Sequence, residues 1–334
     1  MEKARFYTRV DDKIRCLLCP RHCLLKEGQE GVCGVRQVSG GELYTTNYGL
    51  CAAVNWDPIE KKPLYHFYPG SKILSLGTYG CNLECSFCQN WSLARGRPEH
   101  GGTTSFSPHQ VLEMIQARGV SFEKAPGVSF TYNEPTVWYE FVYDTAKLLH
   151  RHGYVNVLVT NGYISLEALD EILPYIDAFN LDLKGFTGSF YREYCRGQRD
   201  PVLTVLERAA NRCHVEVTCL LIPSVNDAPE DLEQMVSWLA GLNPDLPLHI
   251  SRYFPSHQLN IPPTPLETLY MAREIALKKL NYVYIGNVPV SEAANTYCPQ
   301  CSRLVIERSG YRTRVPGLHG QNCRYCGQHI PLIL

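Results

Sequence analysis

The sequence predicts an α/β fold: a partial (β/α)6 barrel with a small cysteine-rich, metal-binding extension at each end. Short β-branched runs alternate with longer amphipathic stretches between about residues 72 and 290, which is typical of a parallel sheet with right-handed crossovers. Six such units fall short of a closed eight-unit barrel of about 250 residues. We therefore expect an N-terminal extension (1–50), a linker covering the barrel mouth (51–71), the barrel (72–290) and a metal-binding tail (291–334).

The elements follow from the apolar pattern and its stop signals. The expected strands are 73–76, 127–132, 156–160, 178–183, 214–222 and 248–253. The expected helices are 108–118, 136–152, 166–176, 202–212, 229–240 and 265–280. Ser107 and Pro108 supply an N-cap and a first helical residue, and Gly153 supplies a helix stop.

Composition indicates a globular protein without an obvious polyanionic partner. Hydrophobic residues make up 45% of the 334 residues, and the formal net charge is -1. That balance gives no general attraction to nucleic acid or to an anionic membrane. Residues 1–5 lack the apolar region of a signal peptide, and no run is long enough to cross a membrane. We expect a cytoplasmic protein.

Fifteen cysteines are many for a reducing compartment, where clustered cysteines more often bind metals than form disulfides. Eleven of them form an N-terminal set (Cys16, Cys19, Cys23, Cys33), a cluster loop (Cys81, Cys85, Cys88) and a C-terminal set (Cys298, Cys301, Cys323, Cys326). The other four, Cys51, Cys195, Cys213 and Cys219, are expected to be small buried hydrophobic residues.

The cluster loop, residues 81–88, carries three cysteines at C-x3-C-x2-C spacing after an apolar run. A four-iron cubane is normally held by four thiolates, so three would leave one iron open. An ordinary zinc site is the alternative, although zinc sites favour paired C-x2-C knuckles or histidine partners. The spacing, with Phe87 before the last cysteine, resembles the signature of radical S-adenosylmethionine (SAM) enzymes. The resemblance implies that Cys81, Cys85 and Cys88 hold a catalytic [4Fe–4S] cluster whose open iron binds SAM.

Polar residues at the carboxyl ends of the strands are the expected ligand contacts. Glu134 follows the second strand and is expected to bind the amino group of SAM. Related activating enzymes use a Gly-Gly-Glu-Pro segment there, and Tyr132 and Asn133 replace the two glycines in this chain. The alternative for Glu134 is a carboxylate interacting with a helix N-terminus.

The third and fourth strands end in further polar residues. Asn161 lies in a Thr-Asn-Gly sequence that resembles the SAM-lining segment of glycyl-radical activases, although Val159 stands where those often have Asp. Asp182 and Lys184 share one face of their strand with Asn180. Asp182 is expected to bind ribose and Lys184 the methionine carboxylate, unless the two form an internal ion pair.

The last predicted strand presents either His249 or Arg252 to the barrel interior, because the two lie on opposite faces. His249 is favoured for contact with adenosine or substrate, and its alternative is a hydrogen-bonded structural histidine. Within the linker, Glu60, Lys61 or His66 could contact substrate. A packed aromatic linker is equally compatible with that sequence.

The C-terminal set forms two C-x2-C knuckles separated by 21 residues, typical of a zinc ribbon or a rubredoxin-like site. So short a tail depends on its metal to fold, and zinc is favoured over iron. The tail and a zinc ion with four thiolates together carry about +2, too little to make nucleic acid the expected partner. The N-terminal set suits zinc or an auxiliary cubane, with zinc favoured and His22 a possible replacement ligand.

Nearly the whole chain resembles the radical SAM member of the AmmeMemoRadiSam group, which is related to pyruvate formate-lyase activating enzymes. The segments that carry the resemblance are 16–23 with 28–36, 57–67, the cluster loop, 132–135, 222–227, 284–287 and the C-terminal set. The resemblance implies a Memo-like and an AMMECR-domain protein as companions, and an electron donor of the flavodoxin or ferredoxin class.

The expected function is anaerobic radical SAM chemistry that abstracts hydrogen from a small-molecule or partner-carried substrate. An activase for a glycyl-radical enzyme is the second reading. A zinc-ribbon nucleic-acid-binding protein is the alternative from another class.

Overall fold

The computed structural model describes residues 1–97, 102–119, 127–289 and 292–334. Its centre is an eight-stranded sheet in the order β16-β15-β14-β13-β12-β11-β9-β8. These strands are β8 (Ala53–Pro58), β9 (Lys72–Gly77), β11 (Gly127–Phe130), β12 (Val155–Thr160), β13 (Ala178–Asp182), β14 (His214–Leu221), β15 (Leu248–Arg252) and β16 (Val283–Gly286). The predicted parallel α/β core is confirmed. The structure adds β16 as a seventh parallel strand and β8 as an antiparallel edge strand on β9.

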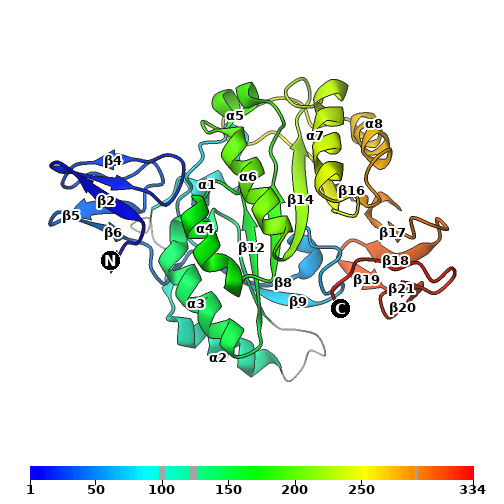
Figure 1. Cartoon of the computed structure of the whole chain (residues 1–334), viewed down its shortest axis with the longest axis horizontal. Coiled ribbons are helices and arrows are strands. Elements are labelled where there is room, and N and C mark those ends of the chain that lie inside the picture. The colour runs from blue at the N-terminus through cyan, green and yellow to red at the C-terminus, as the bar shows by residue number, and fades with distance from the viewer. Residues whose placement is uncertain (98–101, 120–126, 290–291) are drawn as a thin grey trace.

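Helices connect the parallel strands and cover the outer face of the sheet (Figure 1). They are α2 (Pro108–Gly119), α3 (Tyr139–Arg151), α4 (Leu166–Ile172), α5 (Gly188–Tyr194), α6 (Arg199–Ala210), α7 (Pro229–Leu242) and α8 (Leu266–Leu277), with the short α1 (Trp91–Ala94) after the cluster loop. The predicted helix 166–176 changes at Leu173 to the 3₁₀ turn η4 (Leu173–Tyr175), which contains Pro174, a residue without a backbone N–H. The predicted helix 136–152 begins as the 3₁₀ turn η3 (Pro135–Trp138), and α5 was not predicted.

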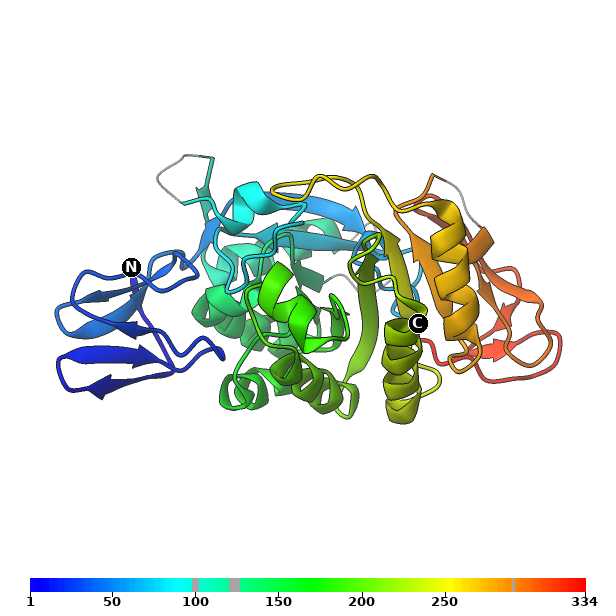
Figure 2. The ribbon, with the colours of Figure 1, turned by 90° about the horizontal axis from the view of Figure 1, so that it is seen from above.

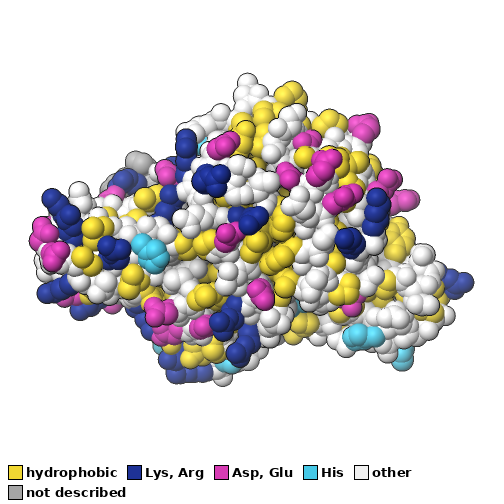
Figure 3. Space-filling model, turned by 45° about the horizontal axis from the view of Figure 1, so that its top comes forward, with side chains coloured by type: hydrophobic (Ala, Val, Ile, Leu, Met, Phe, Trp, Pro, Cys, Tyr) yellow, Lys and Arg dark blue, Asp and Glu magenta, His cyan; other side chains and the backbone are white. Residues whose placement is uncertain are grey.

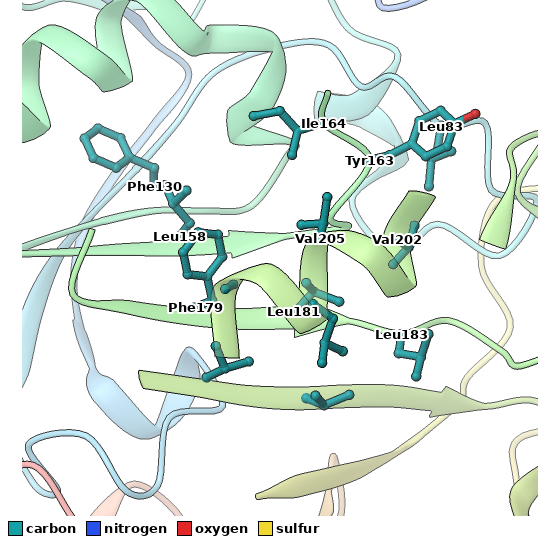
Figure 4. Packing of buried hydrophobic residues seen from close by; sticks show 14 of the residues in the cluster. Leu83, Phe130, Leu158, Tyr163, Ile164, Phe179, Leu181, Leu183, Val202 and Val205 are labelled. Carbon is teal, nitrogen blue, oxygen red and sulfur yellow. The ribbon is translucent and has the colours of Figure 1, made fainter. Parts of the chain in front are cut away.

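Alternation along each strand separates the apolar core from the interior of the barrel. On β13, Phe179 and Leu181 are buried and point toward the helices, where Leu181 lies close to Val202 and Val205 of α6 (Figure 4). Asn180 and Asp182, the residues between and after them, line a cavity on the other face. The core therefore fixes which polar side chains reach the barrel interior.

The two extensions lie at opposite ends of the long axis (Figures 1 and 2). The N-terminal extension contains two three-stranded sheets, β1-β6-β5 and β2-β3-β4. Its strands are β1 (Glu2–Lys3), β2 (Tyr7–Val10), β3 (Lys13–Cys16), β4 (Leu24–Leu25), β5 (Arg36–Ser39) and β6 (Glu42–Thr45), and β7 (Leu50–Cys51) pairs with β10 (Thr104–Ser105). The tail contains β17 (Thr296–Tyr297), β18 (Leu304–Ser309), β19 (Arg312–Arg314), β20 (Leu318–His319) and β21 (Asn322–Cys323).

The tail packs against residues 59–67, which we call the wall segment. The Arg308 guanidinium donates to the backbone oxygen of Tyr65 at 2.7 Å and lies 4.2 Å from the centre of its ring. Near the end of the tail, the Ile333 N–H donates to the backbone oxygen of His66 at 2.8 Å. The tail therefore supports one side of the barrel.

None of the helices in the described part of the chain is long and apolar enough to span a membrane.

Candidate active site

A cavity of about 640 Å³ opens at the carboxyl ends of the parallel strands, within the range of ~300–1,000 Å³ typical of ligand sites. Residues on or just after each of the seven parallel strands line it. They include every residue predicted for the cluster and for SAM: Cys81, Cys85, Cys88, Glu134, Asn161, Asp182, Lys184 and His249. Residues from distant parts of the chain thus converge on one space, while their individual roles stay predictions.

The cluster loop is held by contacts around its first cysteine. The Leu83 N–H donates to the Cys81 Sγ at 3.4 Å, and the Asn161 amide nitrogen lies 3.7 Å from the same sulfur. Burial, and then the charge of Glu134, raises the pKa of the Cys81 thiol above its usual range. A buried thiol of this kind stays protonated unless a metal replaces the proton. The environment therefore fits a metal–sulfur site.

Glu134 lies between β11 and η3 and is 2% exposed. One carboxylate oxygen accepts from the Thr136 N–H at 2.9 Å and the Thr160 hydroxyl at 2.7 Å, and the other accepts from the Asn161 N–H at 2.8 Å. Burial raises its pKa despite these donors. The carboxylate does cap η3, as the alternative reading holds, and it also faces the cavity, where a ligand amine would be a further donor.

Tyr132 shows how the chain manages without the two glycines of related enzymes. Its φ is 72°, in the left-handed region that glycine adopts most easily. Its hydroxyl donates to Asp57, which also pairs with the amines of Lys61 at 2.9 Å and Lys62 at 2.6 Å. Burial lowers the pKa of Lys62 to about 8. The strained backbone is thus tied to a charged network on β8 and the wall segment.

Asp182 and Lys184 form an ion pair of 3.0 Å within the cavity lining. The pairing agrees with the alternative reading and leaves part of each side chain open, 36% and 17% exposed respectively. The Asn226 amide donates to the backbone oxygen of Lys184 at 2.8 Å, so the 222–227 segment fixes the position of this lysine. Both charges remain available to a ligand at the cavity surface.

Glu216 is a buried functional candidate that sequence reasoning missed. It is 0% exposed, and its oxygens lie 2.6 Å from His249 Nε2 and 3.0 Å from His214 Nε2. Burial raises its pKa, but the two histidines outweigh that effect and hold the pKa well below its usual range. The available signal was alternation: Glu216 shares one face of its strand with His214 and Thr218, whereas the other face is apolar.

The structure decides which face of β15 points inward. His249 and Ser251 line the cavity, while the Arg252 Nε donates to the backbone oxygen of Thr264 at 2.8 Å, outside the cavity lining. His249 is 2% exposed and bonded to Glu216, so it is both a cavity residue and the hydrogen-bonded histidine of the alternative reading.

The predicted substrate contacts of the wall segment separate into two groups. Glu60 and Lys61 line the cavity. The prediction for His66 was wrong, because this residue is fully buried with Nε2 2.6 Å from the Tyr284 hydroxyl and Nδ1 3.0 Å from the backbone oxygen of Pro331. Burial lowers the pKa of His66 to about 3. His66 therefore links the barrel to the tail through buried hydrogen bonds.

The three sets of cysteines differ in the distance between their sulfurs. In the C-terminal set, Sγ atoms lie 3.6 Å apart for Cys298 and Cys326 and 3.7 Å apart for Cys301 and Cys323, and all four lie within 4.8 Å of one another. Across residues 1–97, 102–119, 127–289 and 292–334, no other group of three His, Cys, Asp or Glu ligand atoms is so tight. The cluster loop and the N-terminal set are therefore wider.

The scattered cysteines lie mostly where expected: Cys51, Cys195 and Cys219 are buried, and Cys213 is half-buried. Cys195 also lies beside the cluster loop. The pKa of the Cys85 thiol lies well above its usual range. The largest cause is its hydrogen bond with the Cys195 thiol, and the next is burial.

The charge on one face of the molecule gives little support to a nucleic-acid interface there. On the face drawn in Figure 3, basic and acidic side chains are interspersed and no large area of one sign is visible.

Comparison with known proteins gives a consistent family relationship. Residues 75–239 match the model of the radical SAM superfamily. An uncharacterized protein of Methanocaldococcus jannaschii is 42% identical over 100% of both chains. A second protein of that organism, named as a candidate glycyl-radical enzyme activating enzyme, is 28% identical over 65% of this chain and 80% of its own.

More distant matches agree with this. The pyruvate formate-lyase-activating enzyme of Clostridium pasteurianum is 26% identical over 49% of this chain and 67% of its own. The crystal structure of a radical SAM methyltransferase from Sphaerobacter thermophilus has a TM-score of 0.50 at 16% identity, covering 66% of this chain and 67% of that one. The structural likeness concerns the fold alone.

Proposed function

Because this chain carries a radical SAM domain, matched over residues 75–239, we propose that it cleaves SAM reductively and abstracts hydrogen from a small-molecule or partner-carried substrate. Cys81, Cys85 and Cys88 would hold the [4Fe–4S] cluster, which when bound supplies the electron that splits SAM into methionine and a 5′-deoxyadenosyl radical. One observation carries the proposal: the three cysteines and the predicted SAM contacts line a single cavity.

The residues of the cavity would bind the two charged ends of SAM separately. Glu134 presents a buried carboxylate to the amino group, and a buried charge pair of this kind gains from the absence of competing water. Lys184 would meet the methionine carboxylate, while Asp182 and Asn161 would accept from and donate to the ribose. The hydrogen bonds that hold these four side chains orient them before the ligand arrives.

The far side of the cavity would receive the substrate. Tyr65 of the wall segment packs edge-on against His249 with ring centres 4.6 Å apart, and Glu216 fixes the ring of that histidine from behind. This pair could orient a polar substrate or hold a proton at Nδ1, the ring nitrogen that does not face Glu216. The packed wall segment would keep water from the reacting atoms.

We further propose zinc at the C-terminal set. Zinc binds thiolate at about 2.3 Å in a tetrahedron, which places the sulfurs about 3.8 Å apart. The distances of 3.6 and 3.7 Å fit that geometry.

The proposed protein partners rest on the family resemblance and on the electron that reductive SAM cleavage requires. An external donor of the flavodoxin or ferredoxin class would supply the electron. The AmmeMemoRadiSam resemblance supports a Memo-like and an AMMECR-domain protein as partners, which affinity capture from the native organism, with both proteins quantified, would test.

The direct test is SAM turnover by the anaerobically reconstituted, reduced enzyme. We expect slow formation of 5′-deoxyadenosine and methionine, and none from Cys85→Ala. Glu134→Gln should weaken SAM binding about tenfold or more at unchanged iron content, since hydrogen bonds to charged groups contribute ~1.5–3 kcal/mol. The exposed Glu167→Gln is the matched control. Full SAM turnover by Cys85→Ala would refute the assignment.

The same preparation tests the second reading. A stable glycyl doublet in the electron paramagnetic resonance (EPR) spectrum of an added glycyl-radical enzyme would favour an activase over our proposal.

A further inference from the structure

The N-terminal set encloses a cavity of its own, separate from the active-site cavity. All four cysteines line it, with Leu18, Leu25 and Arg36 among the residues that complete it. Gly31 presents no side chain there; a β-carbon at this glycine would lie 3.7 Å from the Cys33 Sγ and 3.8 Å from the Cys23 Sγ. Four thiols thus converge on an enclosed space from several turns of the chain.

These thiols are not arranged as tightly as those of the tail. One tetrahedral zinc ion would draw the four sulfurs to within about 4 Å of one another. Among the described residues, which include all of residues 1–50, the N-terminal sulfurs do not form a group as tight as the C-terminal set. A cubane binds each thiolate through a different iron and therefore spaces its sulfurs more widely.

The charge beside the thiols matches an anionic cluster. Arg36 is 1% exposed and its Nη1 lies 3.7 Å from the Cys16 Sγ. Its Nε is buried and has no hydrogen-bond partner among the described residues. Glu140 pairs with the other end of the guanidinium and holds it in place. A cluster sulfur or a thiolate would accept a hydrogen bond from this unpaired N–H of the buried guanidinium.

The N-terminal set also touches the cluster loop. Gly80, which directly precedes Cys81, adopts a φ of 94°, and a β-carbon there would lie 2.6 Å from the Cys33 backbone oxygen. Asn82 lines the N-terminal cavity, and its side-chain oxygen accepts from the Asn161 amide at 3.0 Å at the edge of the active site. This hydrogen bond therefore joins a residue of one cavity lining to a residue of the other.

We propose that the N-terminal set holds a second [4Fe–4S] cluster, which accepts single electrons from an external flavodoxin- or ferredoxin-class donor beside the active site. In each transfer the donor loses one electron and the cluster passes from the +2 to the +1 state, with no bond made or broken in the protein. The cluster site itself stands on the N-terminal geometry, while its use in catalysis rests on the proposed function.

Metal analysis and EPR of two complementary variants test the site. The triple variant Cys81→Ala/Cys85→Ala/Cys88→Ala lacks the cluster-loop thiols and should retain about four iron atoms per chain. After reduction with dithionite it should show a [4Fe–4S]⁺ signal that does not change when SAM is added. Reduced ferredoxin should bleach its visible absorbance by one electron equivalent.

The reciprocal variant is Cys19→Ala/Cys33→Ala. Its iron content should fall to about half of the wild-type value, and the remaining EPR signal should change on addition of SAM. Cys213→Ala is the matched control, since this half-buried thiol lies in neither set and its loss should leave iron unchanged.

The outcomes separate the two proposals. A triple variant without iron, holding about two zinc ions per chain instead of one, would overturn the second cluster even if SAM cleavage by the wild type is normal. Loss of SAM cleavage in a wild type that keeps both clusters would count against the proposed function and leave the N-terminal site standing. If Cys19→Ala/Cys33→Ala does not fold, the triple variant still decides the question.

Discussion

The two ends of this chain each carry four cysteines, and they differ in the space that those cysteines enclose. The C-terminal sulfurs crowd within 4.8 Å of one another, whereas the N-terminal sulfurs stand further apart around a cavity that includes a buried arginine. Each set offers the same number of cysteine ligands. The difference teaches that sulfur spacing and neighbouring charge, rather than the count of cysteines, indicate which metal group a site suits.

The ends also support different parts of the active site. The N-terminal extension contacts the cluster loop through Cys33 and Gly80. The tail contacts the wall segment through Arg308 and through Thr313, whose hydroxyl donates to Glu60 at 2.7 Å. One extension therefore contacts the cluster loop and the other contacts the wall segment.

Breaking the tight site should have the largest effect. Structural zinc contributes an apparent ~10–16 kcal/mol to small modules, so Cys301→Ala should release the metal and unfold residues 292–334. Because the tail supports the wall segment, hydrogen exchange should also rise across residues 59–67. Zinc analysis and hydrogen-exchange mass spectrometry measure both effects, with Cys213→Ala as control.

The visible absorbance of a cluster bound to the cluster loop should persist in Cys301→Ala, because Arg308 and Thr313 of the tail contact the wall segment and not this loop. A wall segment that stays fully protected after zinc loss would show that the two regions fold independently.

Removing the charge beside the wide site should have the next largest effect. Arg36→Met leaves Glu140 buried without its charged partner, and breaking a buried pair in this way costs ~3–5 kcal/mol of the free energy of unfolding. Arg9→Met removes an exposed partner of Glu42 in the same extension and should cost far less, because solvent screens exposed ion pairs. Urea titration monitored by tryptophan fluorescence gives both values.

Arg36→Met/Glu140→Leu should recover part of the lost stability, because it removes the orphaned carboxylate. Equal losses from Arg36→Met and Arg9→Met would contradict a special role for the buried charge.

The smallest expected effect is a pH dependence of the wall segment. Burial lowers the pKa of Lys62 from 10.5 to about 8, so between these pH values the unfolded chain binds more protons than the folded one. Stability contributed by this group should therefore rise with pH across that window. Lys62→Met should flatten the rise, whereas Lys61→Met, which removes a more exposed partner of Asp57, should preserve it. An unchanged pH profile of Lys62→Met in urea titrations would contradict the assignment.

Much of the fold and of the cavity lining could be predicted because both depend on local patterns. The six predicted strands all form, and the turn and capping signals of Ser107 and Gly153 mark real helix ends. Alternation correctly put Asn180 and Asp182 on the cavity face. β16 escaped prediction because it is short and fully apolar in pattern, so its four residues carry no period that separates a strand from a loop.

The missed parts depend on pairs that are distant in sequence. Glu216 accepts from the His66 N–H across 150 positions, and Tyr132 meets Asp57 across 75. Neither partner is marked by a local motif. His66 could be read as a free ligand for the same reason, since nothing near it in sequence shows that Tyr284 and the tail enclose it.

The contact between the wall segment and the tail has a consequence for the order in which the protein matures. The N-terminal set and the cluster loop are synthesised within the first 88 residues, but His66 waits for the backbone oxygen of Pro331, which is made 265 positions later. At about 5–20 residues per second, the ribosome separates these events by many seconds. A nascent chain thus has both sets of cysteines well before the tail can pack against the wall segment, which would leave time for metal insertion while the barrel is still accessible.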